Sequence, residues 1–182
     1  MIKQGDKITN ARTGQVMIFR KTGAETNGAL LQIECINPKS VEREPLHVHP
    51  KQESSCEVLS GTLYFLVGSK EIKVSAGESL TIRAGLPHCF WNEDATEAHH
   101  IQRFSPALNI ADFFETFFAL SREGKLNKNG IPNLFHGSVI MMAHKDEIRL
   151  VSPPWPLQYF AYLLLAPIGR LMGYTAGYKS TR

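Results

Sequence analysis

The sequence predicts a mainly β protein, a sandwich or closed barrel of antiparallel strands, followed by an α-helical extension. Short segments rich in Val, Ile, Leu, Phe and Thr recur about every 8–12 residues up to Phe104 and are separated by Gly, Pro, Asn and Asp. No segment of about ten residues with apolar residues at helical spacing interrupts that region. Beyond Ser105-Pro106 the pattern changes, because the apolar residues there recur at helical spacing.

The expected strands are bounded by turn-forming residues and contain β-branched and aromatic side chains. They span 15–20, 28–36, 62–67, 71–74, 79–82, 89–91 and 99–104. Gly68-Ser69 suits a hairpin turn between the third and fourth of them. We therefore divide the chain into a β-barrel over residues 1–104 and a helical extension over residues 105–182, packed on the barrel or at a dimer interface.

The first part of the extension predicts one helix and one ambiguous segment. Asn109 is the expected N-cap of a helix over 110–120, in which four phenylalanines form a wide apolar face. Gly124 is expected to end this helix. Residues 134–142 are apolar and fit a strand or a helix.

The last part of the extension predicts a helix over 157–172 that is kinked or broken near Pro167. Pro167 and Arg170 leave a continuous apolar run of about ten residues, where about 20 are needed to span a bilayer. The tail carries basic residues and no acid, which is compatible with contact at a membrane surface. We expect instead that this helix docks on the barrel or on a second subunit, and that the protein is a homodimer without membrane contact.

Composition sets the class of protein. The chain has 182 residues, 43% apolar and 20% charged, which fits one folded domain with an appendage and excludes a disordered chain. The net charge of +3 is too small to indicate nucleic acid. Residues 1–104 carry 12 basic and 12 acidic side chains, so the whole excess lies in the extension. The N-terminal residues contain no apolar segment of a secretory signal, and the three cysteines form neither a CxxC pair nor an even set for disulfides. We therefore expect a cytoplasmic protein with reduced cysteines.

Three histidines have spacing that can bind a metal. His47 and His49 flank Val48, and on a strand both side chains point to one face. Glu53 follows four residues later, and His88 ends a segment that contains Gly and Pro. Imidazoles with one carboxylate suit divalent Fe, Mn, Ni, Zn or Cu and do not suit calcium. The spacing alone is also compatible with three unrelated histidines.

Two longer motifs around these histidines resemble those of the cupin superfamily. The first is HxH, three or four residues, Glu, six residues and Gly; here it runs from His47 to Gly61. The second runs from Gly77 to Asn92 and contains Gly85 and His88 at the family's intervals, with Arg83 in place of its Pro. The resemblance implies a double-stranded β-helix, or jelly-roll barrel, over roughly residues 28–104. It also implies His47, His49, Glu53 and His88 as ligands of a divalent transition metal (Fe, Mn, Ni or Zn).

The register of the first motif leaves three alternatives open. Counting back from Gly61 by the family's spacing reaches Ser54, whereas counting forward from His49 permits Glu53 or Ser54. A one-residue shift reverses the face of a strand side chain, so Glu53 points outward unless a bulge turns it inward. The site therefore has four ligands, or three histidines as in the thiol dioxygenases of the superfamily, or is degenerate and holds metal weakly.

The same register predicts which residues line the pocket. If Ser54 faces inward, Cys56 does too, and Phe90 shares the face of His88. Ser54, Cys56 and Phe90 are the expected pocket residues, and the catalytic residues stay unassigned. The resemblance implies a metal-binding cupin that acts on a small organic molecule, as a dioxygenase rather than an isomerase. A non-catalytic small-molecule binder with a weak or absent metal site is the alternative. The helical tail, with Asn-Gly-Ile-Pro-Asn at 129–133, resembles that of small bacterial cupins of unassigned activity, which implies no substrate.

Overall fold

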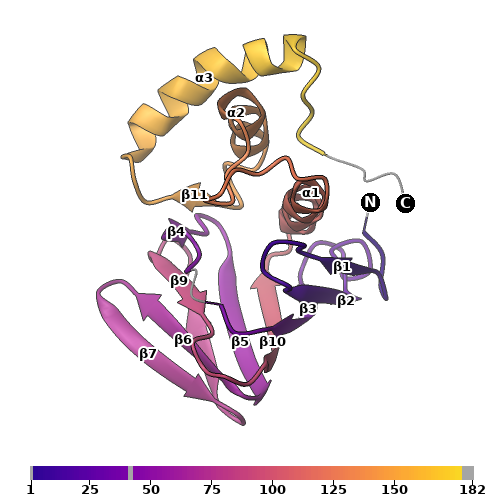
Figure 1. Cartoon of the computed structure of the whole chain (residues 1–182), viewed down its shortest axis with the longest axis vertical. Helices are drawn as coiled ribbons and strands as arrows, with labels where there is room; N and C mark the ends of the chain where they lie inside the picture. The colour runs from indigo at the N-terminus through magenta and orange to yellow at the C-terminus, as the bar shows by residue number, and fades with distance from the viewer. Residues whose placement is uncertain (1, 41–42, 178–182) are drawn as a thin grey trace.

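Two antiparallel sheets and three helices form the protein. The structure is a computed structural model and describes residues 2–40 and 43–177. Both sheets lie on one side of the molecule and the helices on the other, with α3 outermost (Figure 1). Strands outnumber helices, and the helices follow the ten strands of the N-terminal part, as the sequence predicts.

The first sheet has six strands in the order β1-β2-β3-β10-β5-β8. Their bounds are Lys7–Thr9 (β1), Val16–Lys21 (β2), Leu31–Asn37 (β3), Ala98–Ser105 (β10), Glu53–Ser60 (β5) and Ser79–Ile82 (β8). The second sheet has the order β11-β4-β9-β6-β7. Its strands are Arg149–Leu150 (β11), His47–Val48 (β4), His88–Trp91 (β9), Thr62–Val67 (β6) and Lys70–Ser75 (β7).

All seven expected strands are present, with ends that differ by up to three residues. The strands that the sequence analysis did not list include three very short ones, β1, β4 and β11, of two or three residues each. Such segments are too short to show a period of two. The unlisted β5 alternates small and polar residues, and its apolar signal is weak because Ser54 and Cys56 occupy buried positions.

The helices of the extension span Ile110–Arg122 (α1), Leu134–Ala143 (α2) and Trp155–Leu171 (α3). Asn109 precedes α1 as expected, but its side chain makes no capping hydrogen bond. Gly124 follows α1 with φ of 65°, a conformation that suits glycine. The ambiguous apolar segment is helical, and α3 continues through Pro167 instead of breaking there.

The extension adds a strand to the second sheet of the barrel. β11 pairs with β4, so that Leu150 lies opposite His47. α3 packs against α2, where Gly169 permits a close approach: a Cβ at this position would lie 2.7 Å from the carbonyl oxygen of Phe135. Within the part of the chain that the structure describes, no helix is long and apolar enough to cross a bilayer. Residues 178–182, which include the basic Lys179 and Arg182, lie outside the described residues.

Gly61 fixes the turn that sets the position of β5. Its φ is 75°, and an added Cβ would lie 2.6 Å from the carbonyl oxygen of Glu97. Gly68 also has positive φ, at 61°, but faces open space. We expect Gly68→Ala to cost about 1 kcal/mol of unfolding free energy from backbone strain. Gly61→Ala should cost about 1–3 kcal/mol more because of the added clash. Urea denaturation of both variants measures the difference, and equal costs would contradict this assignment.

Candidate metal centre

Three buried histidines come together at strands β4 and β9 of the second sheet. β4 begins at His47, and the two-residue spacing sends His47 and His49 to the same side. His88 begins β9 and pairs directly with His47. Their exposed fractions are 7% for His47, 4% for His49 and 5% for His88. Their ligand atoms lie within 4.8 Å of one another. The structure thus brings together three of the four predicted metal ligands.

Each histidine ring is oriented by a backbone carbonyl. Nδ1 of His47 lies 2.8 Å from the oxygen of Pro45, and Nδ1 of His88 lies 2.8 Å from that of Leu86. Nδ1 of His49 lies 2.6 Å from the carbonyl oxygen of Glu147. Because a carbonyl only accepts, Nδ1 carries the proton in all three rings, and each Nε2 is left with a free lone pair. Second partners of this kind are what hold metal-binding imidazoles in place.

The same environment keeps the rings uncharged. Burial, with the neighbouring histidines adding to it, lowers the pKa of His47 to about 3. Burial lowers the pKa of His49 to about 4, and it also lowers the pKa of His88. At neutral pH the three imidazoles are therefore neutral, the form that binds divalent transition metals.

The register of β5 decides the place of Glu53. Glu53 is exposed at the start of the strand, whereas Ser54 is 2% exposed and lines the pocket. The pairing of β5 with β10 and β8 is regular around these residues, so no bulge turns Glu53 inward. The structure therefore does not bring Glu53 to the three histidines, because this side chain points to the opposite face from Ser54. The register of β5 is the one obtained by counting back from Gly61, which places Ser54 on the inner face.

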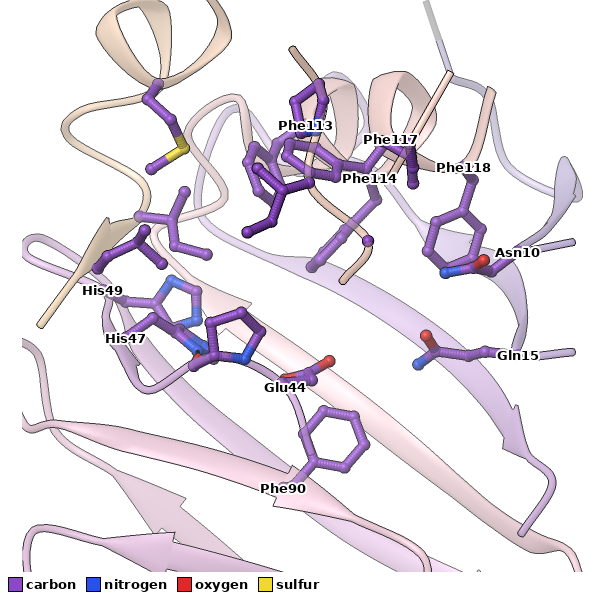
Figure 2. Close-up of a pocket in the computed structure, with 18 of the residues that line it drawn as sticks. Asn10, Gln15, Glu44, His47, His49, Phe90, Phe113, Phe114, Phe117 and Phe118 are labelled. Atoms are coloured by element: carbon purple, nitrogen blue, oxygen red, sulfur yellow. Dashed lines mark hydrogen bonds between the residues drawn. The ribbon is translucent and has the colours of Figure 1, made fainter. Parts of the chain in front are cut away.

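The histidines adjoin a pocket of about 420 Å³ that is lined by both sheets and by the extension. Figure 2 shows four phenylalanines of α1 on one side of this pocket, facing the polar side chains that the barrel contributes. The phenylalanines are Phe113, Phe114, Phe117 and Phe118. The extension therefore does more than pack on the barrel, because α1 forms one wall of the space beside the histidines.

The three expected pocket residues all line this space. Ser54 and Cys56 enter it from β5, and Phe90 from β9 beside His88. Burial raises the pKa of the Cys56 thiol to about 12, so this side chain is an uncharged thiol at neutral pH. It lines the pocket as a small apolar group and not as a thiolate ligand.

Three polar pocket residues were missed by the sequence analysis. Glu44 lies before β4, and burial raises its pKa to about 8, so it is protonated at neutral pH. Gln15 and His100 are 8% and 1% exposed, and Nε2 of Gln15 and Nδ1 of His100 have no hydrogen-bond partner among the described residues. Two of them gave a signal in the sequence. One of the neighbours His99 and His100 must face inward on a strand, and Gln15 alternates with Met17 in the expected strand over 15–20. Glu44 lies outside strands, where no period reveals a direction.

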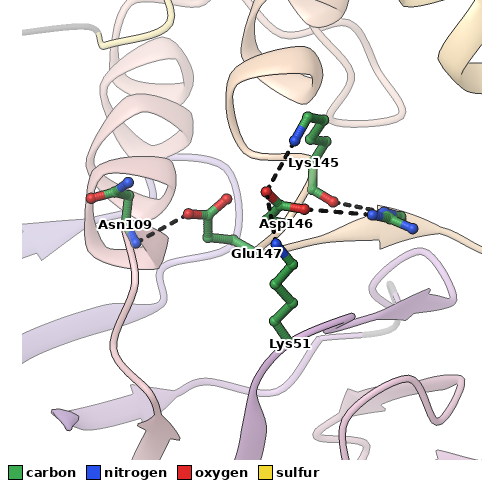
Figure 3. Close-up of polar contacts among 6 residues, drawn as sticks. Lys51, Asn109, Lys145, Asp146 and Glu147 are labelled. Carbon is green, nitrogen blue, oxygen red and sulfur yellow. Dashed lines mark hydrogen bonds and ion pairs between the residues drawn. The ribbon is translucent and has the colours of Figure 1, made fainter. Parts of the chain in front are cut away.

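The turn before β11 joins the extension to the metal centre. The Glu147 carbonyl accepts the His49 hydrogen bond, and the Glu147 carboxylate accepts from the backbone N–H of Asn109 at 3.2 Å. Next to it, Asp146 forms an ion pair with Lys51 at 3.2 Å (Figure 3). Because Lys51 lies two residues after His49 and Asn109 precedes α1, this turn is held by both parts of the chain.

Comparison with known proteins gives the family. The sequence of residues 33–101 matches the family described as "Cupin domain". The chain contains a cupin domain. This match covers both histidine motifs and confirms the resemblance on which the ligand set was predicted. A search of the curated proteins found no significant match to this chain.

A solved structure shares the fold of this chain, and two others were found with lower scores. An RmlC-like cupin from Shewanella frigidimarina is 18% identical, with 61% of this chain and 93% of that chain covered and a TM-score of 0.50. A predicted oxalate decarboxylase from Thermotoga maritima is 20% identical, with 58% and 99% covered and a TM-score of 0.49. KdgF from a Halomonas species is 13% identical, with 54% and 84% covered and a TM-score of 0.48. At 18% identity, the similarity to the RmlC-like cupin shows the fold alone.

The buried histidines predict a loss of stability in acid. Burial lowers the pKa of His100 to about 3 from the usual 6.5, so the unfolded chain binds more protons as the pH falls below 6.5. In chelator-treated protein we expect the wild type to lose about 1 kcal/mol more unfolding free energy than His100→Leu between about pH 7.5 and 5.5. Urea denaturation at the two pH values checks this. Parallel losses in the two proteins would show that His100 is not buried in its neutral form.

Proposed function

We propose that this cupin is a metal-dependent enzyme that acts on a small, uncharged and largely apolar organic molecule. The observation that carries the proposal is the convergence of three neutral histidines on one wall of a pocket that the helical extension helps to line. The donor set suits a divalent transition metal, Fe, Mn, Ni or Zn, because it consists of three imidazole nitrogens with free lone pairs. A metal held there supplies Lewis-acid or redox chemistry beside the pocket.

An oxygenase reaction is favoured over isomerisation. The ligand set without Glu53 resembles the three-histidine alternative of the sequence analysis, that of the thiol dioxygenases. Glu44 is the one carboxylate among the described residues that line the pocket, whereas an isomerase moves protons with paired acid and base groups. In a dioxygenase reaction both atoms of O2 enter the organic substrate, which provides all four electrons, and no further reductant is needed.

The lining supports a substrate without charge. Of the described lining residues, Arg12 is the one cation and Glu44 the one acid. Aromatic rings of α1 form the opposite wall, where an apolar body of the substrate can pack. The unpartnered nitrogens of Gln15 and His100 can bond one or two polar atoms of the substrate. A phosphorylated substrate fits poorly, since its charge would be desolvated without a lysine or arginine cluster.

Metal binding is the first test. With chelator-treated full-length protein, calorimetric titration with Fe, Mn, Ni or Zn should show about one ion bound per chain. His47→Ala and His88→Ala should weaken binding by at least about tenfold to a hundredfold. Glu53→Ala is the matched control and should leave the affinity unchanged, because its carboxylate is exposed on the other face of β5. Loss of affinity in Glu53→Ala equal to that in His88→Ala would contradict the three-histidine site.

The alternative is a non-catalytic small-molecule binder. The outward position of Glu53 favours this alternative. Three neutral imidazoles bring no negative charge, so such a site holds a cation less strongly than one with a carboxylate. If the chelator-treated protein binds none of the four metals while a small apolar probe still stabilises it, the binder replaces the enzyme as the function.

The substrate class has its own test. Phenol should raise the midpoint of thermal unfolding of the full-length protein, because its ring and hydroxyl match the aromatic wall and the unpartnered nitrogens. Glucose 6-phosphate should leave the midpoint unchanged, since the lining has no basic cluster to receive the phosphate. Stabilisation by glucose 6-phosphate and not by phenol would overturn the proposed substrate class.

A further inference from the structure

The outer face of α3 is exposed and apolar. α3 packs on α2 through a face on which Gln158, Ala166 and Gly169 are buried. On the remaining surface, which we call the α3 outer face, six large apolar side chains have exposed fractions between 45% and 89%. They are Leu157, Phe160, Leu163, Leu164, Ile168 and Leu171. A helix that meets only water carries polar residues on its solvent side, so this face needs an apolar partner.

The placement of α3 leaves this face accessible along its whole length. Five of the six side chains recur at spacings of three or four residues, which sets them in one row along the helix. Figure 1 shows α3 running along the outside of α2, on the side away from both sheets. A flat surface can therefore contact the row from Leu157 to Leu171 without meeting the barrel.

The charge of this segment is uniformly positive. From residue 148 to the end, the sequence has four basic residues and no Asp or Glu. Arg170 is exposed on α3, and the guanidinium of Arg149 lies 4.0 Å above the ring of Trp155 at the start of the helix. Trp with basic residues at the ends of an apolar face is the arrangement of helices that lie in the headgroup region of a bilayer.

We propose that the α3 outer face binds the surface of a membrane that contains anionic phospholipid. The helix lies in the plane of the interface, in agreement with the finding that no described helix can span a bilayer. The sequence analysis expected this helix to dock on the barrel or on a second subunit without membrane contact; α3 packs on α2 through one face, and the proposal concerns the opposite face. A second copy of the chain fits less well: in a twofold pairing of two such faces, no acid within 148–177 could compensate the two Arg170 side chains.

Vesicle co-sedimentation of the full-length protein tests the proposal. We expect binding to vesicles of phosphatidylcholine with phosphatidylserine, and weaker binding to phosphatidylcholine alone. Leu164→Glu should weaken the binding by at least about tenfold. Leu59→Glu is the matched control, since Leu59 is 45% exposed on β5 and Leu164 is 55% exposed on α3. It should bind vesicles like the wild type.

Other outcomes identify other occupants. A wild-type protein that does not sediment with either vesicle overturns the proposal. So does equal binding by Leu164→Glu and wild type. If light scattering shows a dimer that Leu164→Glu converts to a monomer, and vesicles bind neither, the face belongs to a second copy. Because the test uses no metal, its failure is independent of the proposed function.

Discussion

The hydrogen bond from Nδ1 of His49 to the Glu147 carbonyl is the interaction on which the metal centre depends. His47 and His88 are oriented by carbonyls two residues before them, so these two rings are set as soon as their own turns form. His49 is oriented by a residue 98 positions away in the sequence. The complete set of three rings with free Nε2 atoms therefore exists only when the extension is docked on the barrel. Pairing of β11 with β4 and the contact of Glu147 with Asn109 hold it there.

Docking of the extension also determines the chemistry of the pocket. The barrel contributes the histidines and a few uncharged polar groups, whereas α1 contributes a wall of aromatic rings. The extension covers one side of this space and so adds to the burial of the histidines, and burial is the main cause of their low pKa values. Docking of the extension thus contributes both to the neutral state of the imidazoles and to the apolar wall of the pocket. A solvent-filled barrel without the extension would have neither, and its histidines would be protonated more readily.

The sequence predicted the barrel, seven of its eight longer strands and the three histidines, because each of these leaves a local pattern. His47 and His49 share a face by strand geometry, and Gly61 marks the register because its positive φ and its contact with Glu97 exclude a side chain. The position of Glu53 could not be decided, since the spacing from His49 permits Glu53 or Ser54 as the inward residue and the spacing from Gly61 selects Ser54. Glu44 was missed because its direction depends on tertiary packing outside regular strands, whereas Gln15 was missed although it begins the expected strand over 15–20. The role of the α1 phenylalanines was missed for a similar reason: an apolar helix face does not reveal whether it meets a core or a cavity.

The central claim is that three histidines and no carboxylate of the chain hold the metal. X-ray absorption spectroscopy of the full-length protein loaded with Zn tests it most directly, because it counts the nitrogen and oxygen neighbours of the ion. The account predicts three imidazole nitrogens at about 2.0–2.1 Å, with the same spectrum for the wild type and Glu53→Ala. A spectrum that loses an oxygen neighbour in Glu53→Ala, or that shows fewer than three imidazoles in the wild type, would contradict it.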